Sequence, residues 1–305
     1  MSRDVPASVK ARLLNGARSR AEEFERTLSR FAIERLLYRL GECGARERCV
    51  LKGASLLSVW LTKPYRATRD IDVLAFGAAD DAAIRALLEE ICAVPCPEDG
   101  LRFDLTNLQI DPIRAAEMYA GHRARFLAYL GTARIRLQVD FGFGDAVGNL
   151  ESIDYPTLLD DLPAPRLRAY PREASVAEKF EAMVKLDTRN SRMKDFHDIW
   201  ALSGALAFDG ARLRSAIAAC FDRRGTPWTA EVPRALAPAF YAEPELRNRW
   251  AAYLEGTGVI TPPPAQFEVI GERIIQFLGP VRSSIVSAAS FEATWPPAGP
   301  WKAVS

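Results

Sequence analysis

Lys52-Gly53-Ala54-Ser55, followed downstream by Arg69-Asp70-Ile71-Asp72, is the stretch of sequence that decides the fold. Successive side chains of a strand point to opposite faces, so Asp70 and Asp72 emerge together while Ile71 packs inward. Two carboxylates on one face can hold Mg²⁺, a hard cation that completes its shell with water and substrate phosphates. The stretch therefore predicts a strand that carries a cation site.

The turn upstream of the acid pair has the composition of a phosphate-binding bend. Residues 49–51 are predicted to form a short buried strand that runs into Gly53, where a missing side chain lets the backbone approach a ligand closely. A helix is predicted to begin at Ser55, because residues 55–61 are too apolar for a loop, and free amides at a helix N-terminus attract anions. Lys52, Gly53 and Ser55 are therefore expected to contact phosphates.

A second strand is predicted to supply a third carboxylate. Residues 133–141 alternate strictly between apolar and polar side chains, and Asp140 lies on the polar face together with Arg134 and Arg136. Guanidinium groups suit phosphate binding. The same alternation is also typical of an ordinary solvated strand face. Only the upstream turn and acid pair favour the functional interpretation.

A later segment adds basic and acidic candidates. Ser175-Val-Ala-Glu178 matches a capping box, which predicts a helix start at that point. Lys179 lies off the centre of the apolar stripe of that helix, so its side chain can reach a cleft. Asp195 and Asp198 are three residues apart and share a face of the next predicted helix. Acids in a first helical turn also stabilise the helix dipole without any chemical role.

Taken together, these motifs resemble the AbiEii/AbiGii nucleotidyltransferase toxins, and the likeness spans most of residues 46–205. Its most specific part is the block Arg-Met-Lys-Asp-Phe-His-Asp at residues 192–198 in combination with the Asp-x-Asp pair. That family belongs to the polymerase-β-like superfamily. Its members are typically toxins of bacterial toxin–antitoxin or abortive-infection systems, and some similar mycobacterial toxins add nucleotides to the 3′ end of transfer RNA.

The resemblance implies a reaction and a set of site residues. The reaction is transfer of a nucleoside monophosphate from an NTP, with one or two Mg²⁺ ions, to an acceptor hydroxyl. The expected acceptor is RNA, at the 3′ end of tRNA, and a cognate antitoxin is the expected protein partner. The expected metal ligands are Asp70, Asp72 and Asp140, the further catalytic residues are Lys179 and Asp198, and the nucleotide-binding residues are Lys52, Gly53, Ser55, Arg69, Lys179, Arg192 and Asp195.

One position departs from the family pattern. Many members have a Gly-Gly pair followed by Thr or Ser, where this chain has Gly53-Ala54-Ser55. An alanine fits there if its φ is negative. It is strained if the second position of the turn requires a positive φ.

Three functional interpretations stay open. A toxin that modifies RNA predicts NTP-dependent labelling of tRNA and growth arrest on expression. The same chemistry on a protein or a small molecule, such as an aminoglycoside, predicts labelling without RNA. A non-catalytic binding module predicts no labelling, and the presence of three acids and the lysine counts against it.

Other chemistry-bearing residues form weaker patterns. The five cysteines lack a paired Cys-x-x-Cys spacing, which argues against a zinc site and a disulfide framework. His197 is expected to pack rather than to act as a base. The glycines of residues 142–148 lack the spacing of a dinucleotide-binding loop.

Composition predicts a globular enzyme of the cytoplasm. The chain has 305 residues, 49% hydrophobic and 26% charged, and no apolar segment approaches the length of a membrane span or signal region. A net charge of +1 does not mark a nucleic-acid-binding protein. Arginine clusters leave a local basic patch open, although an arginine bias can also follow genomic base composition.

The order of the predicted elements indicates an α+β fold, with helices between residues 8 and 42, strands near 49, 71, 103, 126 and 135, and helices near 55 and 80. A hairpin is predicted at Gly131-Thr132, followed by a short strand at 166–169 and helices to Gly279. This order predicts a polymerase-β-like nucleotidyltransferase domain with a small mixed sheet, followed by a mostly helical C-terminal domain. The predicted boundaries are 1–45 for N-terminal helices packing on the catalytic domain, 46–165 for the catalytic domain, 166–290 for the helical domain contributing nucleotide-binding residues, and 291–305 for a Pro/Trp-rich tail, either docked or disordered.

Overall fold

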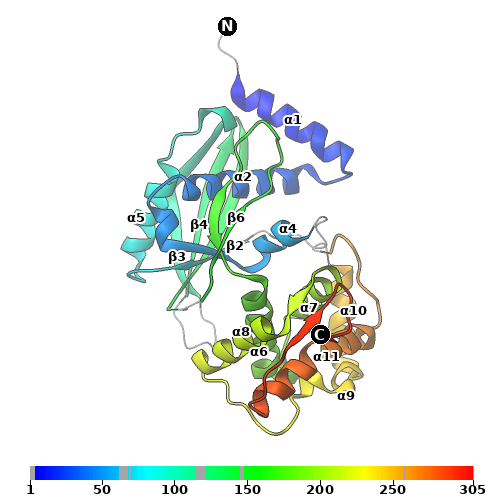
Figure 1. Ribbon diagram of the computed structural model, residues 1–305. Helices are drawn as coiled ribbons and strands as arrows, with labels where there is room; N and C mark the ends of the chain where they lie inside the picture. Colours follow the sequence, from blue (N-terminus) through cyan, green and yellow to red (C-terminus); the bar gives the residue numbers. More distant parts are fainter. Residues whose placement is uncertain are drawn as a thin grey trace. The chain divides into compact units, whose positions relative to one another are not determined.

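Figure 1 shows the computed structural model of the chain, which divides into two compact units. Unit 1 is Met1–Thr62 with Thr68–Tyr170, and unit 2 is Lys63–Ala67 with Pro171–Ser305. Within the described residues, no helix combines the length and apolar character needed to cross a bilayer. The structure describes residues 4–61, 68, 70–113, 121–144, 148–256 and 259–304.

A seven-stranded mixed sheet organises unit 1, in the order β3-β4-β5-β2-β1-β7-β6. Strands β2 and β5 are parallel neighbours, as are β1 and β7, and the other neighbouring pairs are antiparallel. The mixed sheet and its surrounding helices confirm the predicted α+β class. The strands are β1 (Cys49–Lys52), β2 (Asp70–Ala75), β3 (Leu101–Ile113), β4 (Gly121–Leu130), β5 (Ala133–Phe143), β6 (Glu151–Asp154) and β7 (Arg166–Ala169).

The hairpin between β4 and β5 forms where the sequence predicts it. Leu130 pairs with Ala133 across the two-residue connection, and Gly131 takes a positive φ of 59°. Tight hairpin turns favour glycine at such a position, because a Cβ is disfavoured there. The short turn sets the register of β4 and β5.

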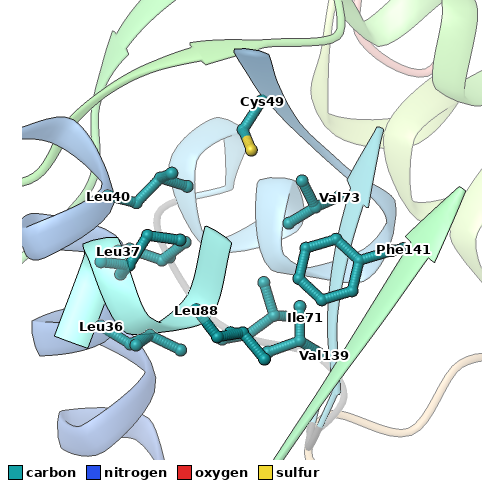
Figure 2. A pocket seen from close by; sticks show the side chains of 10 residues that line it. Leu36, Leu37, Leu40, Cys49, Ile71, Val73, Leu88, Val139 and Phe141 are labelled. Carbon is teal, nitrogen blue, oxygen red and sulfur yellow. The ribbon is translucent and has the colours of Figure 1, made fainter. Parts of the chain in front are cut away.

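Helices α2 and α5 cover one face of the sheet, and Figure 2 shows their leucines and the inward side chains of β2 and β5 around one space. Ile71, Val73, Val139 and Phe141 are almost fully buried on this side. Burying one such side chain stabilises the fold by roughly 1.5–3 kcal/mol. An apolar cavity of about 20 Å³ remains between them. The helical segments of unit 1 are α1 (Val5–Ser19), α2 (Phe24–Gly41), α3 (Ala45–Arg48), η1 (Gly53–Leu56), α4 (Leu57–Trp60), α5 (Asp81–Cys92) and η2 (Pro97–Asp99).

Buried charges on α2 find partners within unit 1. The Arg39 guanidinium donates to both carboxylate oxygens of Asp99, at 2.6 and 3.2 Å. Glu34 accepts a hydrogen bond from the Leu158 amide at 2.7 Å. Burial raises the pKa of Glu34 to about 7, because desolvation outweighs the hydrogen bond from that amide and the nearby positive charge of Arg35.

Unit 2 consists of helices and a small antiparallel sheet in the order β10-β9-β8. The C-terminal tail is docked rather than disordered: Trp295 is fully buried and its Nε1 donates to the Ser203 carbonyl at 2.7 Å. Trp301 Nε1 donates to the Phe277 carbonyl at 2.8 Å. The elements are α6 (Arg172–Leu186), η3 (Asp187–Arg189), α7 (Met193–Ala205), β8 (Phe208–Asp209), α8 (Gly210–Arg223), η4 (Arg234–Leu236), α9 (Pro238–Tyr241), α10 (Pro244–Glu255), α11 (Phe267–Val286), β9 (Ala293–Trp295) and β10 (Lys302–Ala303).

Two helix ends differ from the sequence prediction. Helix α6 begins at Arg172 after Pro171, and Ser175 is buried inside the helix, so the predicted capping box is wrong. Helix α11 continues past Gly279 and through Pro280. Apolar residues on both sides of this proline are buried, and their packing offsets the hydrogen bond that a proline cannot donate.

The strand β7 lies in the sheet of unit 1. Leu51 of β1 pairs in parallel with Ala169 of β7, and β6 pairs with the other edge of β7. The division between the compact units therefore follows Tyr170, whereas the sequence placed a boundary before Arg166. Proline residues around the strand suggested an interdomain connection, but the strand completes the sheet.

Candidate active site

Four charged residues form one row across the middle of the sheet. Lys52 pairs with Asp72, Asp72 with Asp140, and Asp140 with Arg123, on the adjacent strands β1, β2, β5 and β4. Partners in register on neighbouring strands direct their side chains to the same face. This face is opposite to the one that α2 and α5 cover, since the alternate residues of β2 and β5 pack beneath those helices. In this row, the carboxylates of Asp72 and Asp140 lie between the basic side chains of Lys52 and Arg123.

Asp70 lies on the same face, two residues before Asp72 and beside Gln138 of β5. Register thus brings Asp140 next to Asp72 and turns all three predicted acids to one side of the sheet. Within the described residues, no three His, Cys, Asp or Glu side chains form a group that could hold a metal ion. Asp140 already has a partner on the neighbouring strand β4.

Arg123 forms a bidentate ion pair with Asp140. Its Nε donates to Oδ1 at 2.8 Å and its Nη2 to Oδ2 at 2.7 Å. Paired donation of this kind is the strongest form of guanidinium–carboxylate contact. The hydrogen bonds that Arg123 donates to Asp140, together with the negative charges of Asp140, Asp70 and Asp72, raise the pKa of Arg123 against the opposing effect of burial. The guanidinium therefore interacts with all three acids.

Arg123 was not among the predicted site residues, although the sequence held the signal for it. Asp140 follows the turn at Gly131-Thr132 by eight residues, and Arg123 precedes the turn by eight. A two-residue hairpin sets such positions opposite each other. Counting outward from the turn would have found the pair.

The bend at Gly53 packs directly against Asp72. Gly53 has a φ of +70°, and a Cβ at this position would lie 2.6 Å from Asp72 Cγ, closer than two non-bonded carbons approach. The positive φ falls on Gly53 and not on Ala54, so the departure from the Gly-Gly pattern carries no backbone strain. Glycine is required at the first position of the bend, and alanine is accommodated at the second.

The other residues of the bend are tied to the sheet. Ser55 is fully buried, and its hydroxyl donates a long hydrogen bond of 3.4 Å to the Asp70 carbonyl. The helical segment starts at Gly53 as a 3₁₀ turn, two residues before the predicted start at Ser55, and continues as α4. Lys52 Nζ lies 5.3 Å from the centre of the Tyr170 ring. The Ser55 hydroxyl is therefore already bonded to the sheet.

A second group of predicted site residues lies in unit 2. Lys179 of α6 contacts Asp195 Oδ1 at 3.2 Å and Asp198 Oδ2 at 2.7 Å, and both carboxylates are fully buried. Arg192, which precedes α7, contacts the other oxygen of Asp195 at 2.7 Å. Buried carboxylates are retained only when paired, so one ammonium and one guanidinium balance two negative charges here. Arg69, also predicted to bind nucleotide, lies outside the described residues.

Comparison with known proteins now defines the family. Residues 35–273 match the profile of the nucleotidyl transferase AbiEii toxin family, of type IV toxin–antitoxin systems, and this match covers most of the chain. The chain belongs to the AbiEii family. The family predicted from the motifs is therefore confirmed, and with it nucleotidyl transfer as the class of activity and type IV toxin–antitoxin systems as the context.

This AbiEii protein is similar to proteins of known structure. The nucleotidyltransferase toxin MenT4 of Mycobacterium tuberculosis is similar with a TM-score of 0.52 at 19% identity, over 90% of this chain and 98% of MenT4. JHP933 of Helicobacter pylori matches with a TM-score of 0.48 at 12% identity, over 83% of this chain and 93% of that protein. No curated protein matches the sequence. MenT4 supports the predicted nucleotidyltransferase fold.

The acids of this AbiEii protein suit a divalent cation by their chemistry. Asp70 and Asp72 offer hard oxygen donors on one face, and Mg²⁺ needs only one or two protein carboxylates besides water and substrate phosphates. The missing Cβ of Gly53 lets the Asp72 carboxylate pack directly against the bend, so the acid pair lies next to the backbone amides of this turn. Both carboxylate oxygens of Asp140 already accept hydrogen bonds from Arg123, so a cation bound there would share this carboxylate with the guanidinium.

The remaining candidates, His197 and the cysteines, lie in environments that indicate a packing role in this AbiEii protein. His197 is fully buried against Trp200 and Trp250, and its Nδ1 lies 2.8 Å from the Tyr253 hydroxyl. All five cysteines are free thiols. Burial raises the pKa of Cys49 to about 12, so it stays protonated and unreactive at neutral pH.

Proposed function

We propose that this AbiEii protein transfers a nucleoside monophosphate from an NTP to a hydroxyl group of RNA, the 3′ end of tRNA being the expected acceptor, in a reaction that requires Mg²⁺. One observation carries the proposal: Asp70, Asp72 and Asp140 share the open face of the sheet beside the bend at Gly53. Membership of the family supports the class of reaction, and the arrangement of the three acids supports this face as its site.

Asp70 and Asp72 are the proposed ligands of Mg²⁺, and Asp140 is the proposed ligand of a second ion. When bound, Mg²⁺ supplies positive charge that stabilises the attacking and leaving oxygens of phosphoryl transfer. The amides around Gly53 orient the triphosphate beside the acids. Lys52 lies at the end of the row and offsets the negative charge that develops on the departing phosphates.

The proposed reaction replaces one phosphorus–oxygen bond by another. The acceptor hydroxyl oxygen bonds to the α-phosphorus of the NTP, while the bond from that phosphorus to the β-phosphate oxygen breaks. Pyrophosphate leaves with the bonding electron pair. The hydroxyl proton passes to a carboxylate of the row, for which Asp140 is the candidate. Atoms and charge balance without an external oxidant or reductant.

Lys179 and Arg192 are proposed to contact nucleotide phosphates, as the family resemblance implies. Asp195 and Asp198 then act as positioning residues, because their buried carboxylates fix the Lys179 ammonium group. A Lys179→Ala variant tests this role in nucleotide binding, with a raised KM for NTP as the expected result. In the cell, the activity is expected in the cytoplasm, restrained by a cognate antitoxin.

The test is incubation of the protein with each labelled NTP, Mg²⁺ and total cellular RNA, beside an Asp70→Ala/Asp72→Ala variant. Label in RNA from one or more nucleotides, absent with the variant or with EDTA, is the expected result. Label appearing on protein or small molecules alone would assign another acceptor. Equal incorporation by the wild type and the variant would remove the proposed site.

A further inference from the structure

The face of the sheet that carries the acids becomes basic away from them. Arg134 and Arg136 of β5 follow the same side as Asp140, and Arg125 of β4 and Arg102 of β3 lie on the same side across the hairpin. All four arginines are exposed. No helix covers this face over β3, β4 and β5 in the described residues, because its long polar side chains remain accessible while the opposite face is buried.

The arginines of this face differ in how they are neutralised. Arg125 contacts Asp111 at 2.6 Å, and Arg102 contacts Asp104 at 3.5 Å. Arg134 and Arg136 form no ion pair with any residue in the described part of the chain. The positive charge of β5 is therefore available to a ligand.

An aromatic residue lies between two of the arginines in the register of the sheet. Tyr129 is in register with Arg102 on one side and Arg134 on the other. Arg102 Cζ lies 4.4 Å from the centre of the Tyr129 ring. Tyr129 is partly buried. Aromatic rings beside positive charge are a feature by which proteins bind single-stranded nucleic acid without sequence preference.

We propose that this surface, the arginine face (Arg102, Arg125, Tyr129, Arg134 and Arg136), binds the phosphodiester backbone of a nucleic-acid acceptor. The inference rests on the proposed function and adds the surface that holds the acceptor. A protein partner is less suited to the face, because the cores of protein interfaces are apolar and depleted of charge, whereas nucleic-acid interfaces are polar and strongly positive. Among the described residues, the large apolar side chains that are exposed all lie elsewhere: Phe76, Val232, Ile260, Val269, Val286 and Val304.

The position of the arginine face suits delivery of a chain end to the acids. Arg136 and Arg134 precede Asp140 by four and six residues on one strand. At about 3.3 Å per residue, the Cα atoms of Arg136 and Arg134 lie roughly 13 and 20 Å from that of Asp140 along the strand. A backbone held along β5 can therefore present its terminal hydroxyl at Asp140.

Binding of a fluorescein-labelled 20-nucleotide RNA, and of DNA of the same sequence, tests the proposal by fluorescence anisotropy. Arg134→Gln/Arg136→Gln is expected to weaken RNA binding about tenfold and to reduce the slope of log K against log salt by roughly 1.4–1.8, as two lost phosphate contacts predict. The matched control is Arg18→Gln/Arg85→Gln, which removes two exposed arginines from helices and should bind as the wild type. The DNA arm separates recognition of the phosphate backbone from recognition of the ribose 2′-hydroxyl.

A gain of affinity provides a test that misfolding cannot imitate. Asp111→Asn removes the carboxylate that pairs with Arg125, and this exposed ion pair contributes little to stability. The variant is expected to bind the labelled RNA about threefold more tightly. Unchanged or weaker binding by Asp111→Asn, with wild-type affinity in Arg134→Gln/Arg136→Gln, would overturn the proposal.

The inference and the proposed function fail in different ways. If the wild type labels RNA but the arginine pair can be removed without loss of RNA binding, only the arginine face is wrong. If no NTP labels RNA, the proposed function is wrong whatever the binding data show. Loss of self-association in Arg134→Gln/Arg136→Gln, measured by size-exclusion chromatography, with unchanged RNA binding would assign the face to a protein contact and overturn the inference.

Discussion

The two faces of β2 and β5 are built from alternate residues of the same two strands and have opposite surroundings. Ile71 and Val139 are buried under α2 and α5, whereas their neighbours Asp72 and Asp140 lie on the open face. Side chains that stabilise the fold therefore alternate, along the same strands, with side chains proposed to carry out the chemistry. Substitutions on the covered face should change the free energy of unfolding, and substitutions on the open face should change the rate of nucleotide transfer.

The largest expected effect is on the open face. Asp140→Asn removes the proposed ligand and proton acceptor and should lower the rate of labelled nucleotide incorporation about 10³-fold, equivalent to roughly 4 kcal/mol. The free energy of unfolding should change by less than about 1 kcal/mol, since the ion pair with Arg123 is partly exposed. Urea denaturation measures the free energy of unfolding, and initial rates measure nucleotide incorporation. A variant as active as the wild type would contradict the proposed role of the open face.

The next effect belongs to the covered face. Phe141 is adjacent to Asp140 and almost fully buried, so Phe141→Ala should lower the free energy of unfolding by about 4 kcal/mol through lost burial and a larger cavity. At a temperature where the variant is folded, its transfer rate should stay within about threefold of the wild type. A large loss of rate with unchanged stability would show that the two faces are not separate.

A pH effect tests the helix over the covered face. Glu34 has a pKa of about 7 against an ordinary value of 4.5. An acid whose pKa is raised in the folded state binds protons more readily when folded, so its contribution to stability is present below pH 4.5 and lost as pH rises through 7. The free energy of unfolding should therefore fall with pH by roughly 3 kcal/mol more in the wild type than in Glu34→Gln.

Urea denaturation of both proteins between pH 4.5 and 8.5 measures that difference. Glutamine keeps an acceptor for the Leu158 amide, so the two proteins should be nearly equal in stability at the acid end. Parallel pH profiles would contradict the prediction. Transfer rates of Glu34→Gln should follow those of the wild type, because the residue does not face the acid row.

The smallest effect is a gain in stability at the cavity of Figure 2. Val139→Ile adds one methyl group to a space of about 20 Å³. At about 24 cal/mol per Å³ of filled cavity, the gain in the free energy of unfolding is roughly 0.5 kcal/mol. A loss of stability would show that the space does not accept the added methyl group.

Local pattern was sufficient for the hairpin strands β4 and β5 and their faces, whereas the short strands β6, β8, β9 and β10 were not predicted. The alternation in residues 133–141 and the turn at Gly131-Thr132 contain the period and the register, and both agree with the structure. The parallel pairing of β2 with β5 is different, because it joins segments far apart in the chain. Only tertiary pairing brings Asp72 beside Asp140, and no local rule sets that register.

The sequence was less informative about side-chain partners. The strand pattern placed Arg134 and Arg136 on the same face as Asp140. The residue that pairs with this acid is instead Arg123 on the neighbouring strand. The capping box failed for a related reason. Ser175 is a good capping residue by type, but Pro171 allows the helix to start one turn earlier and Ser175 becomes part of its buried side. Partner choice depends on neighbours that the local sequence does not contain.

The central claim is that the acids of the open face carry out nucleotide transfer, and Asp72→Asn tests it most directly. The measurement is the Mg²⁺-dependent rate of labelled nucleotide incorporation into RNA, with Asp154→Asn, an exposed acid on β6 of the same sheet, as the matched control. The account predicts a loss of at least about 10³-fold for Asp72→Asn, with unchanged melting temperature, and wild-type rates for Asp154→Asn. Incorporation by Asp72→Asn at the wild-type rate would contradict the account.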